Sequence, residues 1–578
     1  MVGAFMEELK LLLKQVYGTS LDPNLSQDII QKIEQSKAGF PRYQAWSEQD
    51  VILITYGDSV LSNELMPIQS LHQFLREYLS GLVSSVHILP FFPFSSDDGF
   101  SVIDYYQVNY SLGDWTDVAK LNQDFELMFD LVMNHCSRQS LWFNDFVNGS
   151  GEGQDYFVES DPTLDYSAVT RPRTSPLIVD VYTRQGLKHV WATFSDDQID
   201  LNFANPKVLL AFVDIFLFYL KHGARFIRLD AVAFVWKILG TNCIHLPQTH
   251  AIVKLLRWVM EQLDPNMVLI TETNVPHQEN ISYFGEGDEA HMVYQFALPP
   301  LLLHALNRGN GHYLTAWARD LVALPKGCNY FNFVASHDGI GVRAVEQIIP
   351  KHEIADLAES VHNFGGFVSM KSNGDGTQNP YELNISLFDA LQGTRTGSDQ
   401  WQVERFLCSQ KLLLSLQGIP GIYIHSLTAT ENDQSLVEQT GRTRSINRHR
   451  WDRQDFEKLL AQEHSSQALV FQRYRDLLAL RKTIAAFHPE AAQRVYDCGD
   501  ALFVLQRGDA PRTADDGAKR NGLLAVFNLT KYPQQVEHYA QLPQAYQAEC
   551  EDLLSDEKVI LAEYKLKPYQ VLWLVPDL

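Results

Sequence analysis

Cysteine is scarce in this sequence, and its few copies are scattered. The 578 residues contain six cysteines, which are Cys136, Cys243, Cys328, Cys408, Cys498 and Cys550. None forms a Cys-x-x-Cys pair, and no spacing of cysteine and histidine matches a zinc site. Such sparse use is typical of reduced thiols in a cytoplasm. We therefore expect a cytoplasmic protein that has no disulfide framework and no metal site.

Long apolar runs and targeting signals are also missing. No stretch of about 18 apolar residues is present, so no membrane-spanning helix is expected. The richest apolar segment, FALPPLLLHAL, is interrupted by Pro299 and Pro300. The first 18 residues lack the basic start and the cleavage site of a secretory signal, and their pattern predicts an amphipathic helix that ends near Gly18.

Positive charge is in deficit. Lys and Arg number 47 against 70 Asp and Glu, which gives a formal net charge of −23. An acidic chain repels nucleic acids and anionic membranes, so we expect neither as a partner. A small anionic substrate remains possible, because one local arginine cluster can hold a phosphate inside an acidic protein.

Short apolar runs alternate with helical patterns over most of the chain. The runs that predict buried strands lie at 51–56, 86–92, 125–135, 225–234, 267–273, 291–300, 330–339 and 418–426. Helical patterns at 208–223 and 252–263 separate some of these runs. Buried strands that alternate with helices favour a parallel sheet, and their number predicts an α/β fold built on a closed (β/α)₈ TIM barrel.

The texture of the sequence divides the chain into three parts. We expect a helical N-terminal extension at 1–48, the barrel at 49–485 and a small C-terminal β domain at 486–578. Between about 136 and 195 the periodic pattern is lost, which predicts an insertion after the third strand. The C-terminal β domain is indicated by short apolar runs joined by turns and by the polar connection at 507–522.

Several acids and histidines fall at the ends of the predicted strands. In a TIM barrel the reactive groups lie where strands end and the following loops begin. The polar residues at these ends are Asp97, Asp98, Asn134, His135, Arg228, Asp230, Glu272, His337 and Asp338. One such residue alone is usually a cap or turn residue, whereas a set at successive strand ends indicates a functional site.

Carboxylates that meet in one pocket are what glycosyl transfer needs. One carboxylate attacks or stabilises the anomeric carbon, and a second group protonates the leaving oxygen. Arg228 lies two residues before Asp230, so both side chains share one face of a strand. This arginine is expected to keep the Asp230 carboxylate ionised and oriented, although a purely structural ion pair is the alternative.

The segments DLVMNH, FIRLDAVAF, ITETN and FVASHDG resemble the four ordered motifs of the α-amylase superfamily, glycoside hydrolase family 13. The resemblance implies that Asp230 is the nucleophile, Glu272 the acid/base and Asp338 the stabiliser of the transition state. It implies that His135, Arg228 and His337 hold the sugar. Many amylases bind calcium near an asparagine like Asn134, but the rest of that site is not recognisable, so neither a metal nor a cofactor is expected.

A narrower resemblance runs from about residue 50 to the C-terminus. HILPFFPFSSDDGFSVIDY, LGDWTDVAKL, TRPR, ASHDGIGV and SINRHR are similar to the sucrose-phosphorylase subfamily, which resolves a covalent glucosyl-enzyme with phosphate instead of water. This resemblance implies that Asp97 and Arg444 clamp the far hydroxyls of the glucose and that Phe100 is the platform beneath it. Such a clamp predicts a small α-glucoside as donor and not starch.

The chain departs from sucrose phosphorylases in ways that resemble the glucosylglycerate phosphorylase branch. It has the helical extension, Phe234 where sucrose phosphorylases have tyrosine, Glu382 where they have glutamine, and a third motif that continues as TETNVPH. The first choice of donor is therefore 2-O-α-D-glucosyl-D-glycerate. The alternatives are phosphorylases of sucrose, sucrose 6-phosphate or glucosylglycerol, an α-glucosidase or transglucosidase, and a non-catalytic amylase-like subunit.

A phosphorylase must bring a phosphate dianion to an anionic site. Arg171 and Arg173 in the TRPR loop can supply forked donors, and Pro172 stiffens their presentation. His245, Tyr381 and Glu382 complete the predicted phosphate and acceptor site. The arginines can alternatively pin a surface loop. We expect small-molecule partners only, and a monomer or a homodimer.

Overall fold

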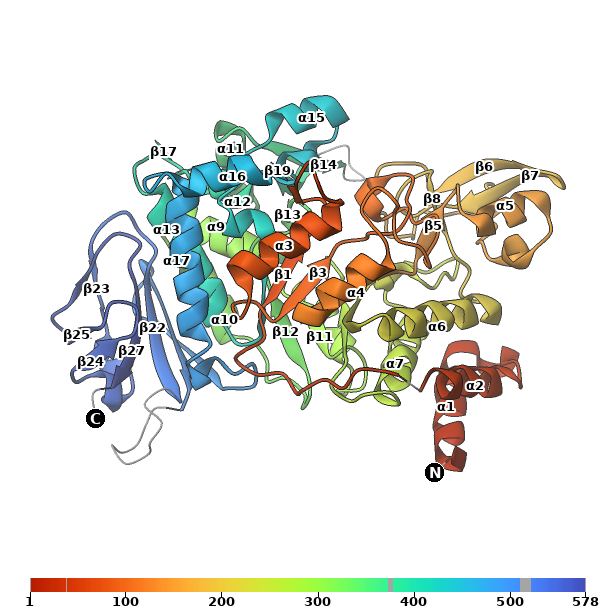
Figure 1. The fold of residues 1–578 in the computed structure, drawn as a ribbon, viewed down its shortest axis with the longest axis horizontal. Coiled ribbons are helices and arrows are strands. Elements are labelled where there is room, and N and C mark those ends of the chain that lie inside the picture. Colours follow the sequence, from red (N-terminus) through yellow and green to blue (C-terminus); the bar gives the residue numbers. More distant parts are fainter. Residues whose placement is uncertain (1, 38, 373–377, 510–520, 577–578) are drawn as a thin grey trace.

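The computed structural model describes residues 2–37, 39–372, 378–509 and 521–576. Its centre is a closed barrel of eight parallel strands (Figure 1). In spatial order they are β1 (Ile52–Thr55), β3 (Ser85–Ile88), β4 (Glu126–Val132), β9 (Ala224–Asp230), β10 (Val268–Thr271), β11 (Met292–Tyr294), β12 (Asn329–Asn332) and β18 (Ile419–Tyr423). The predicted TIM barrel is confirmed. Its strands are buried on both faces, which is why they appear in the sequence as continuous apolar runs.

Helices surround the barrel. They are α3 (Pro67–Leu79), α4 (Trp115–Asp124), α6 (Pro206–Lys221), α7 (Pro247–Glu261), α9 (Leu298–Arg308), α10 (His312–Arg319), α13 (Gln402–Ser415) and α17 (Ser466–Arg481). Helix α6 shows how the sequence sets their limits. The Asn205 side chain caps its start by accepting from the Lys207 amide, Pro206 occupies the first turn, and Gly223 follows its end at φ 99°.

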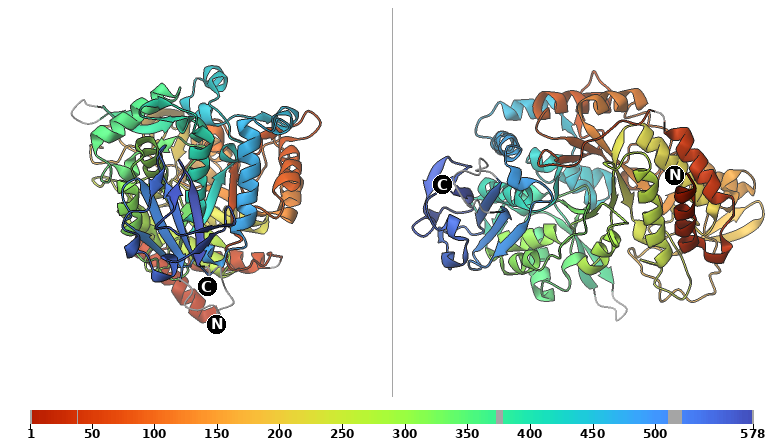
Figure 2. Two further views of the ribbon diagram at one scale, coloured as in Figure 1. Left: turned by 90° about the vertical axis from the view of Figure 1, so that its left-hand side faces the viewer. Right: turned by 90° about the horizontal axis from the view of Figure 1, so that it is seen from below.

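Two N-terminal helices form a layer outside the barrel helices. Helix α1 (Val2–Tyr17) contacts α7, and α2 (Leu25–Ser36) contacts α6, as the view from below shows (Figure 2). The Tyr17 hydroxyl donates to the carbonyl oxygen of Phe203 at 3.1 Å, and Lys32 pairs with Asp214 at 2.6 Å. The N-terminal extension therefore packs on the side of the barrel that is covered by α6 and α7.

The predicted insertion after the third barrel strand contains ordered elements at one end of the molecule (Figure 1). They are β5 (His135–Ser137), α5 (Leu141–Asn148), β6 (Ile178–Thr183), β7 (Gly186–Trp191) and β8 (Gln198–Asp200). Strand β8 returns to pair antiparallel with β5, so that His135 lies opposite Asp200. The excursion thus closes slightly beyond residue 195.

A second excursion, not anticipated from the sequence, follows β12. It carries β13 (Ile340–Gly341), α11 (Lys351–Asn363), β14 (Phe367–Ser372) and β15 (Gln378–Asn384). The three strands form an antiparallel sheet in the order β13-β15-β14. Shorter elements follow, namely α12 (Leu387–Ala390), β16 (Gly393–Thr394), β17 (Gly397–Ser398), α14 (Ile424–Leu427), α15 (Gln434–Thr440), β19 (Trp451–Asp452) and α16 (Arg453–Leu460).

The C-terminal region is a β sheet at the opposite end of the molecule from the insertion (Figure 1). Its strands, in order, are β20 (Gln493–Tyr496), β21 (Leu502–Gly508), β22 (Gly522–Asn528), β27 (Val571–Pro576), β24 (Cys550–Asp552) and β25 (Glu557–Val559). Side chains alternate between two cores: Phe503 and Leu505 join the barrel core, whereas Leu502 and Val504 join a separate cluster. Most of the predicted connection at 507–522 lies outside the described residues.

All eight predicted runs extend beyond the strands that they contain, and three of them show the reason. The run 291–300 is a strand only over Met292–Tyr294, because α9 begins at Leu298 and takes both prolines into its first turn, where a missing amide is tolerated. The run 330–339 leaves the sheet after Asn332, and 225–234 leaves it after Asp230. No helix in the described ranges is long and apolar enough to cross a membrane.

Candidate active site

One pocket gathers most of the predicted site residues. Eleven of the fourteen line it: Asp97, Phe100, His135, Arg173, Asp230, Glu272, His337, Asp338, Tyr381, Glu382 and Arg444. Of the other three, Arg228 lies beneath the carboxylates, while Arg171 and His245 are outside the lining. The pocket walls come from the loops after the barrel strands, from the insertion and from the β13–β15 sheet.

The barrel itself sets the position of the catalytic candidates. Asp230 is the last residue of β9, and Glu272 directly follows β10, its neighbour in the barrel. Asp338 lies in the loop that follows β12. Since all eight strands run parallel, their carboxyl ends form one rim, and these three carboxyl groups reach the same pocket.

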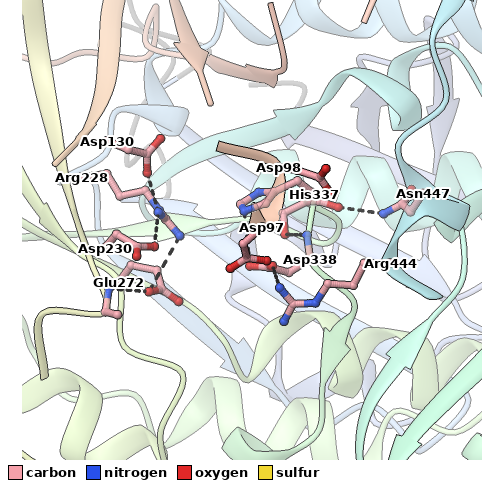
Figure 3. A network of polar contacts seen from close by, with 12 residues as sticks. Asp97, Asp98, Asp130, Arg228, Asp230, Glu272, His337, Asp338, Arg444 and Asn447 are labelled. Carbon is pink, nitrogen blue, oxygen red and sulfur yellow. Dashed lines mark hydrogen bonds and ion pairs between the residues drawn. The ribbon is translucent and has the colours of Figure 1, made fainter. Parts of the chain in front are cut away.

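Arg228 connects the nucleophile candidate to a buried network (Figure 3). Its side chain is 2% exposed, and its Nη1 donates to Asp230 Oδ1 at 2.8 Å and to Asp130 Oδ1. The other oxygen of Asp130 lies 2.6 Å from His87 Nε2. The guanidinium is thus fixed from both sides, and it orients the Asp230 carboxylate toward the pocket.

The carboxyl groups of Asp230 and Glu272 titrate together, because both are buried beside Arg228. Burial raises the pKa of Glu272 to about 7 against the lowering influence of Arg228, and the carboxylates of Asp230 and Asp338 raise it further. Burial also raises the pKa of Asp230 to about 7, although Arg228 donates directly to that carboxylate and opposes the rise. Arg228 stands farther from Glu272, at 3.8 Å. When the two groups share one proton, the direct bond from Arg228 favours the charge on Asp230 and the proton on Glu272.

Asp338 is ionised for a different reason. Burial alone raises its pKa, but Arg444, which donates to Asp338 Oδ1 at 2.6 Å, holds that pKa well below the usual value. Arg444 also makes a two-pronged contact with Glu382, at 3.0 and 2.7 Å. Asp97 accepts instead from Gln198 at 3.1 Å, and no bond between Asp97 and Arg444 occurs within the part of the chain that the structure describes.

The loop that carries Asp97 is held in a strained conformation. Asp97 and Asp98 have φ values of 53° and 47°, in the left-handed region that disfavours side chains with a Cβ. Arg448 and Arg442 both pair with the Asp98 carboxylate. Such backbone persists only when its surroundings fix it, and these two ion pairs fix it at the edge of the pocket.

An aromatic floor lies beside the carboxylates. The ring of Phe100 stacks on that of His337 with centroids 5.0 Å apart and planes 8° from parallel, and Arg228 lies 5.5 Å from the Phe100 centroid. Burial lowers the pKa of His337 to about 3, so this imidazole is neutral. His135 Nε2 contacts the Phe100 carbonyl oxygen at 3.0 Å, and Gln198 at 3.1 Å. A flat apolar surface with polar groups around its edge suits a pyranose ring.

The predicted phosphate and acceptor residues divide into two groups. Arg173 and Tyr381 line the pocket, and burial raises the pKa of Tyr381. Arg171 instead donates to the Ser175 carbonyl oxygen within its own loop. His245 contacts the Tyr283 hydroxyl at 2.8 Å and Glu279 at 3.2 Å, and it does not line the pocket.

A lysine ammonium group lies beside Asn134, the residue that resembles a calcium ligand of amylases. Lys237 Nζ is 2.9 Å from Asn134 Oδ1 and 2.7 Å from Asp200 Oδ2. Its ammonium group therefore joins the end of the third barrel strand to the last strand of the insertion. Among the described residues, no group of three or more His, Cys, Asp or Glu side chains has the arrangement of a metal site.

Several functional candidates cannot be recognised from the sequence, because only contacts reveal them. Asp130, His87, Gln198 and Arg343 touch or line the site across long sequence separations. Asp130 offered one signal, since an acid inside the continuous apolar run FELMFDLV is costly to bury without a partner.

Comparisons with known proteins agree with this geometry. The family described as α-amylase catalytic domain matches residues 74–341. A protein named glucosylglycerate phosphorylase from Escherichia coli (strain K12) is 42% identical over 566 residues, 97% of this chain and 98% of its own. Another of that name, from Spirochaeta thermophila, is 45% identical over 538 residues, 91% of this chain and 90% of its own.

A solved structure extends the agreement to the fold. The sucrose 6F-phosphate phosphorylase from Thermoanaerobacter thermosaccharolyticum superimposes with a TM-score of 0.71 at 25% identity, over 83% of this chain and 94% of its own. The chain belongs to the α-amylase family of barrel enzymes, glycoside hydrolase family 13. Within that family it belongs to the sucrose-phosphorylase-like group, together with the glucosylglycerate phosphorylases.

Proposed function

We propose that the protein is a retaining glycoside phosphorylase that converts a small α-glucoside and inorganic phosphate into α-D-glucose 1-phosphate and a free acceptor. The observation that carries this proposal is that Asp230, to which Arg228 donates, and Glu272, whose pKa is raised to about 7, face one pocket. Relatives named glucosylglycerate phosphorylase, similar over nearly the whole chain, support 2-O-α-D-glucosyl-D-glycerate as the donor.

In the first half-reaction, a carboxylate oxygen of Asp230 attacks C1 of the glucosyl group. The bond between C1 and the acceptor oxygen breaks, and Glu272 transfers its proton to that oxygen. The products are a β-glucosyl ester of Asp230 and a free acceptor alcohol. Asp338, ionised beside Arg444, stabilises the positive charge that develops on the sugar ring.

In the second half-reaction, phosphate occupies the place that the acceptor has left. Glu272, now a carboxylate, takes a proton from the phosphate hydroxyl while the phosphate oxygen attacks C1. The ester bond breaks, and Asp230 leaves as a carboxylate. Two inversions at C1 give net retention, so the product is the α anomer.

The pocket's far end favours a single glucose ring. Phe100 supplies the platform, and Asp97, His135 and His337 supply hydrogen-bonding groups around it. Arg444, tied to both Asp338 and Glu382, closes one side of the ring site. A longer glucan would have to displace these buried groups, and for that reason we propose a small glucoside and not starch.

The proposed reaction also bears on where in the cell the protein works. Small molecules are its substrates, and a phosphorylated product that cannot diffuse through a membrane is useful where it is made. We therefore propose a cytoplasmic location, consistent with six buried cysteines, and a monomer or homodimer.

The test is a panel of α-glucosides incubated with phosphate, with glucose 1-phosphate as the readout. We expect release from 2-O-α-D-glucosyl-D-glycerate and little from sucrose, sucrose 6-phosphate or maltose. Release from sucrose instead would make the protein a phosphorylase of the same group with a different donor. Free glucose in place of glucose 1-phosphate would make the protein a hydrolase or transglucosidase, and no turnover of any donor would point to a binding subunit.

A further inference from the structure

The arginines that line the pocket differ in whether they are paired with a carboxylate. Three arginines face it, namely Arg173, Arg343 and Arg444. Arg444 is occupied by Asp338 and Glu382. By contrast, neither Arg173 nor Arg343 makes a side-chain hydrogen bond or an ion pair with any residue in the ranges that the structure describes. A guanidinium left unpaired in a pocket indicates that its counter-ion comes from a ligand.

Arg343 has a defined place in the wall of the pocket. It begins the short helix η6 (Arg343–Val345), which is separated from β13 only by Val342. Strand β13 pairs antiparallel with β15, where Gly341 lies opposite Glu382, and the Val342 amide donates to the Tyr381 carbonyl oxygen at 3.1 Å. Arg343 is therefore anchored by its backbone next to Tyr381, and its two neighbours in the helix are buried.

The two unpaired arginines come from different segments of the chain. Arg173 belongs to the insertion after the third barrel strand, and Arg343 to the excursion after β12. Both are close enough to Tyr381 to act on its hydroxyl: burial raises the pKa of Tyr381, and Arg173, Arg444 and Arg343 each lower it. Arg173 and Arg343 thus bring positive charge to the part of the pocket around Tyr381, beside the Glu382 carboxylate that is paired with Arg444.

We propose that Arg343 is the residue that selects an acceptor with a carboxylate next to the reacting hydroxyl, that is, a 2-hydroxy acid such as D-glycerate. This inference rests on the proposed function and deepens it. Arg343 pairs with the carboxylate while the adjacent oxygen lies at Glu272, and Arg173 is the main partner of the phosphate. A neutral polyol of the same size leaves Arg343 partly desolvated and unpaired, which lowers its affinity.

The reaction cycle gives Arg343 a second task. The acceptor leaves before phosphate enters, so both anions use the same end of the pocket at different times. A pair of arginines can hold the dianionic phosphate, whereas a single one suffices for the carboxylate. Arg343 variants should therefore lose more with the carboxylate acceptor than with phosphate, because Arg173 still serves phosphate.

The test compares Arg343→Met and Arg343→Lys with wild type. Transfer from glucose 1-phosphate to D-glycerate and to glycerol is measured, together with calorimetric binding of D-glycerate to the free enzymes. Losing a charge-assisted hydrogen bond should lower kcat/KM for D-glycerate and the affinity for it about 10- to 100-fold in Arg343→Met. Arg343→Lys keeps the positive charge but not the two-pronged guanidinium, so its values for D-glycerate should lie between those of wild type and Arg343→Met. Values for glycerol should stay within about 3-fold.

Arg319→Met is the matched control, because Arg319 is 53% exposed and only reaches Asp497 at 4.0 Å. Unchanged D-glycerate binding in folded Arg343→Met would overturn the inference, as would an equal loss with glycerol. Failure of the proposed function looks different: wild type then forms no glucose 1-phosphate from any donor, yet calorimetry still decides whether Arg343 binds the carboxylate. Circular dichroism and the unfolding temperature establish that each variant is folded.

Discussion

Replacing Lys237 with methionine is expected to loosen the insertion from the barrel. The Lys237 and Asp200 side chains are 7% and 0% exposed, and their charged atoms lie 2.7 Å apart. Lys237 also donates to Asn134. Methionine fills a similar volume but supplies neither the charge nor the donor. It leaves the Asp200 carboxylate buried with only the uncharged donors of Thr193 and Asn134.

The size of the effect follows from the burial of the pair. Breaking a buried ion pair by removing one partner costs about 3–5 kcal/mol, whereas replacing both partners with uncharged groups costs much less. Lys237→Met should therefore be far less stable than wild type, and Lys237→Met with Asp200→Asn should recover most of the loss. Lys120→Met is the control, because Lys120 is 56% exposed and 3.8 Å from Asp117, a geometry worth about 0–1 kcal/mol.

Hydrogen exchange of the amides in β5 and β8 is the assay, supported by the unfolding temperature. These strands lie next to Lys237 and carry His135 and Gln198, so their opening also disturbs the sugar pocket. A loss of about 3 kcal/mol corresponds to exchange roughly 100-fold faster in both strands. Exchange in Lys237→Met that matches wild type, or no recovery in the double variant, would refute the role of this lysine.

Three further predictions concern the chemistry. Asp230→Asn should lower turnover at least about 10³-fold while the fold is retained, because the nucleophile is lost; full activity would remove the assignment. Donor cleavage needs protonated Glu272, whose pKa is raised to about 7, so kcat/KM should fall as pH rises through about 7. This alkaline limb should be absent from the residual activity of Glu272→Gln, and a limb that persists would point to another acid. Arg173→Ala should raise the KM for phosphate about 10-fold or more with little change in glucose inhibition; equal changes in both would place Arg173 elsewhere.

The barrel was predictable because a strand buried on both faces is apolar along its whole length. The strand ends were not, since residues beyond the sheet are buried as well. Phe333 and Val334 follow β12 and are 5% and 2% exposed, although they line the pocket and belong to no strand. Apolar character therefore reports burial, and it does not report where the hydrogen-bonded ladder stops.

The carboxyl groups of the site were predictable from their position at strand ends. Their supporting residues were not, because each acts through a contact that sequence spacing does not show. Asp130 reaches Arg228 across 98 positions, and Lys237 reaches Asn134 across 103. Arg343 depends on a strand pairing in the second excursion, which has no strong periodic signal.

The most direct test of the account is the dependence of donor cleavage on phosphate. Cleavage of 2-O-α-D-glucosyl-D-glycerate is followed while phosphate is raised from zero to saturation, and the products are identified by NMR. If phosphate releases the glucosyl group, cleavage rises from near zero with phosphate, and the product is glucose 1-phosphate of the α configuration. Equal cleavage without phosphate, or a β product, would contradict the proposal that phosphate releases the glucosyl group from Asp230.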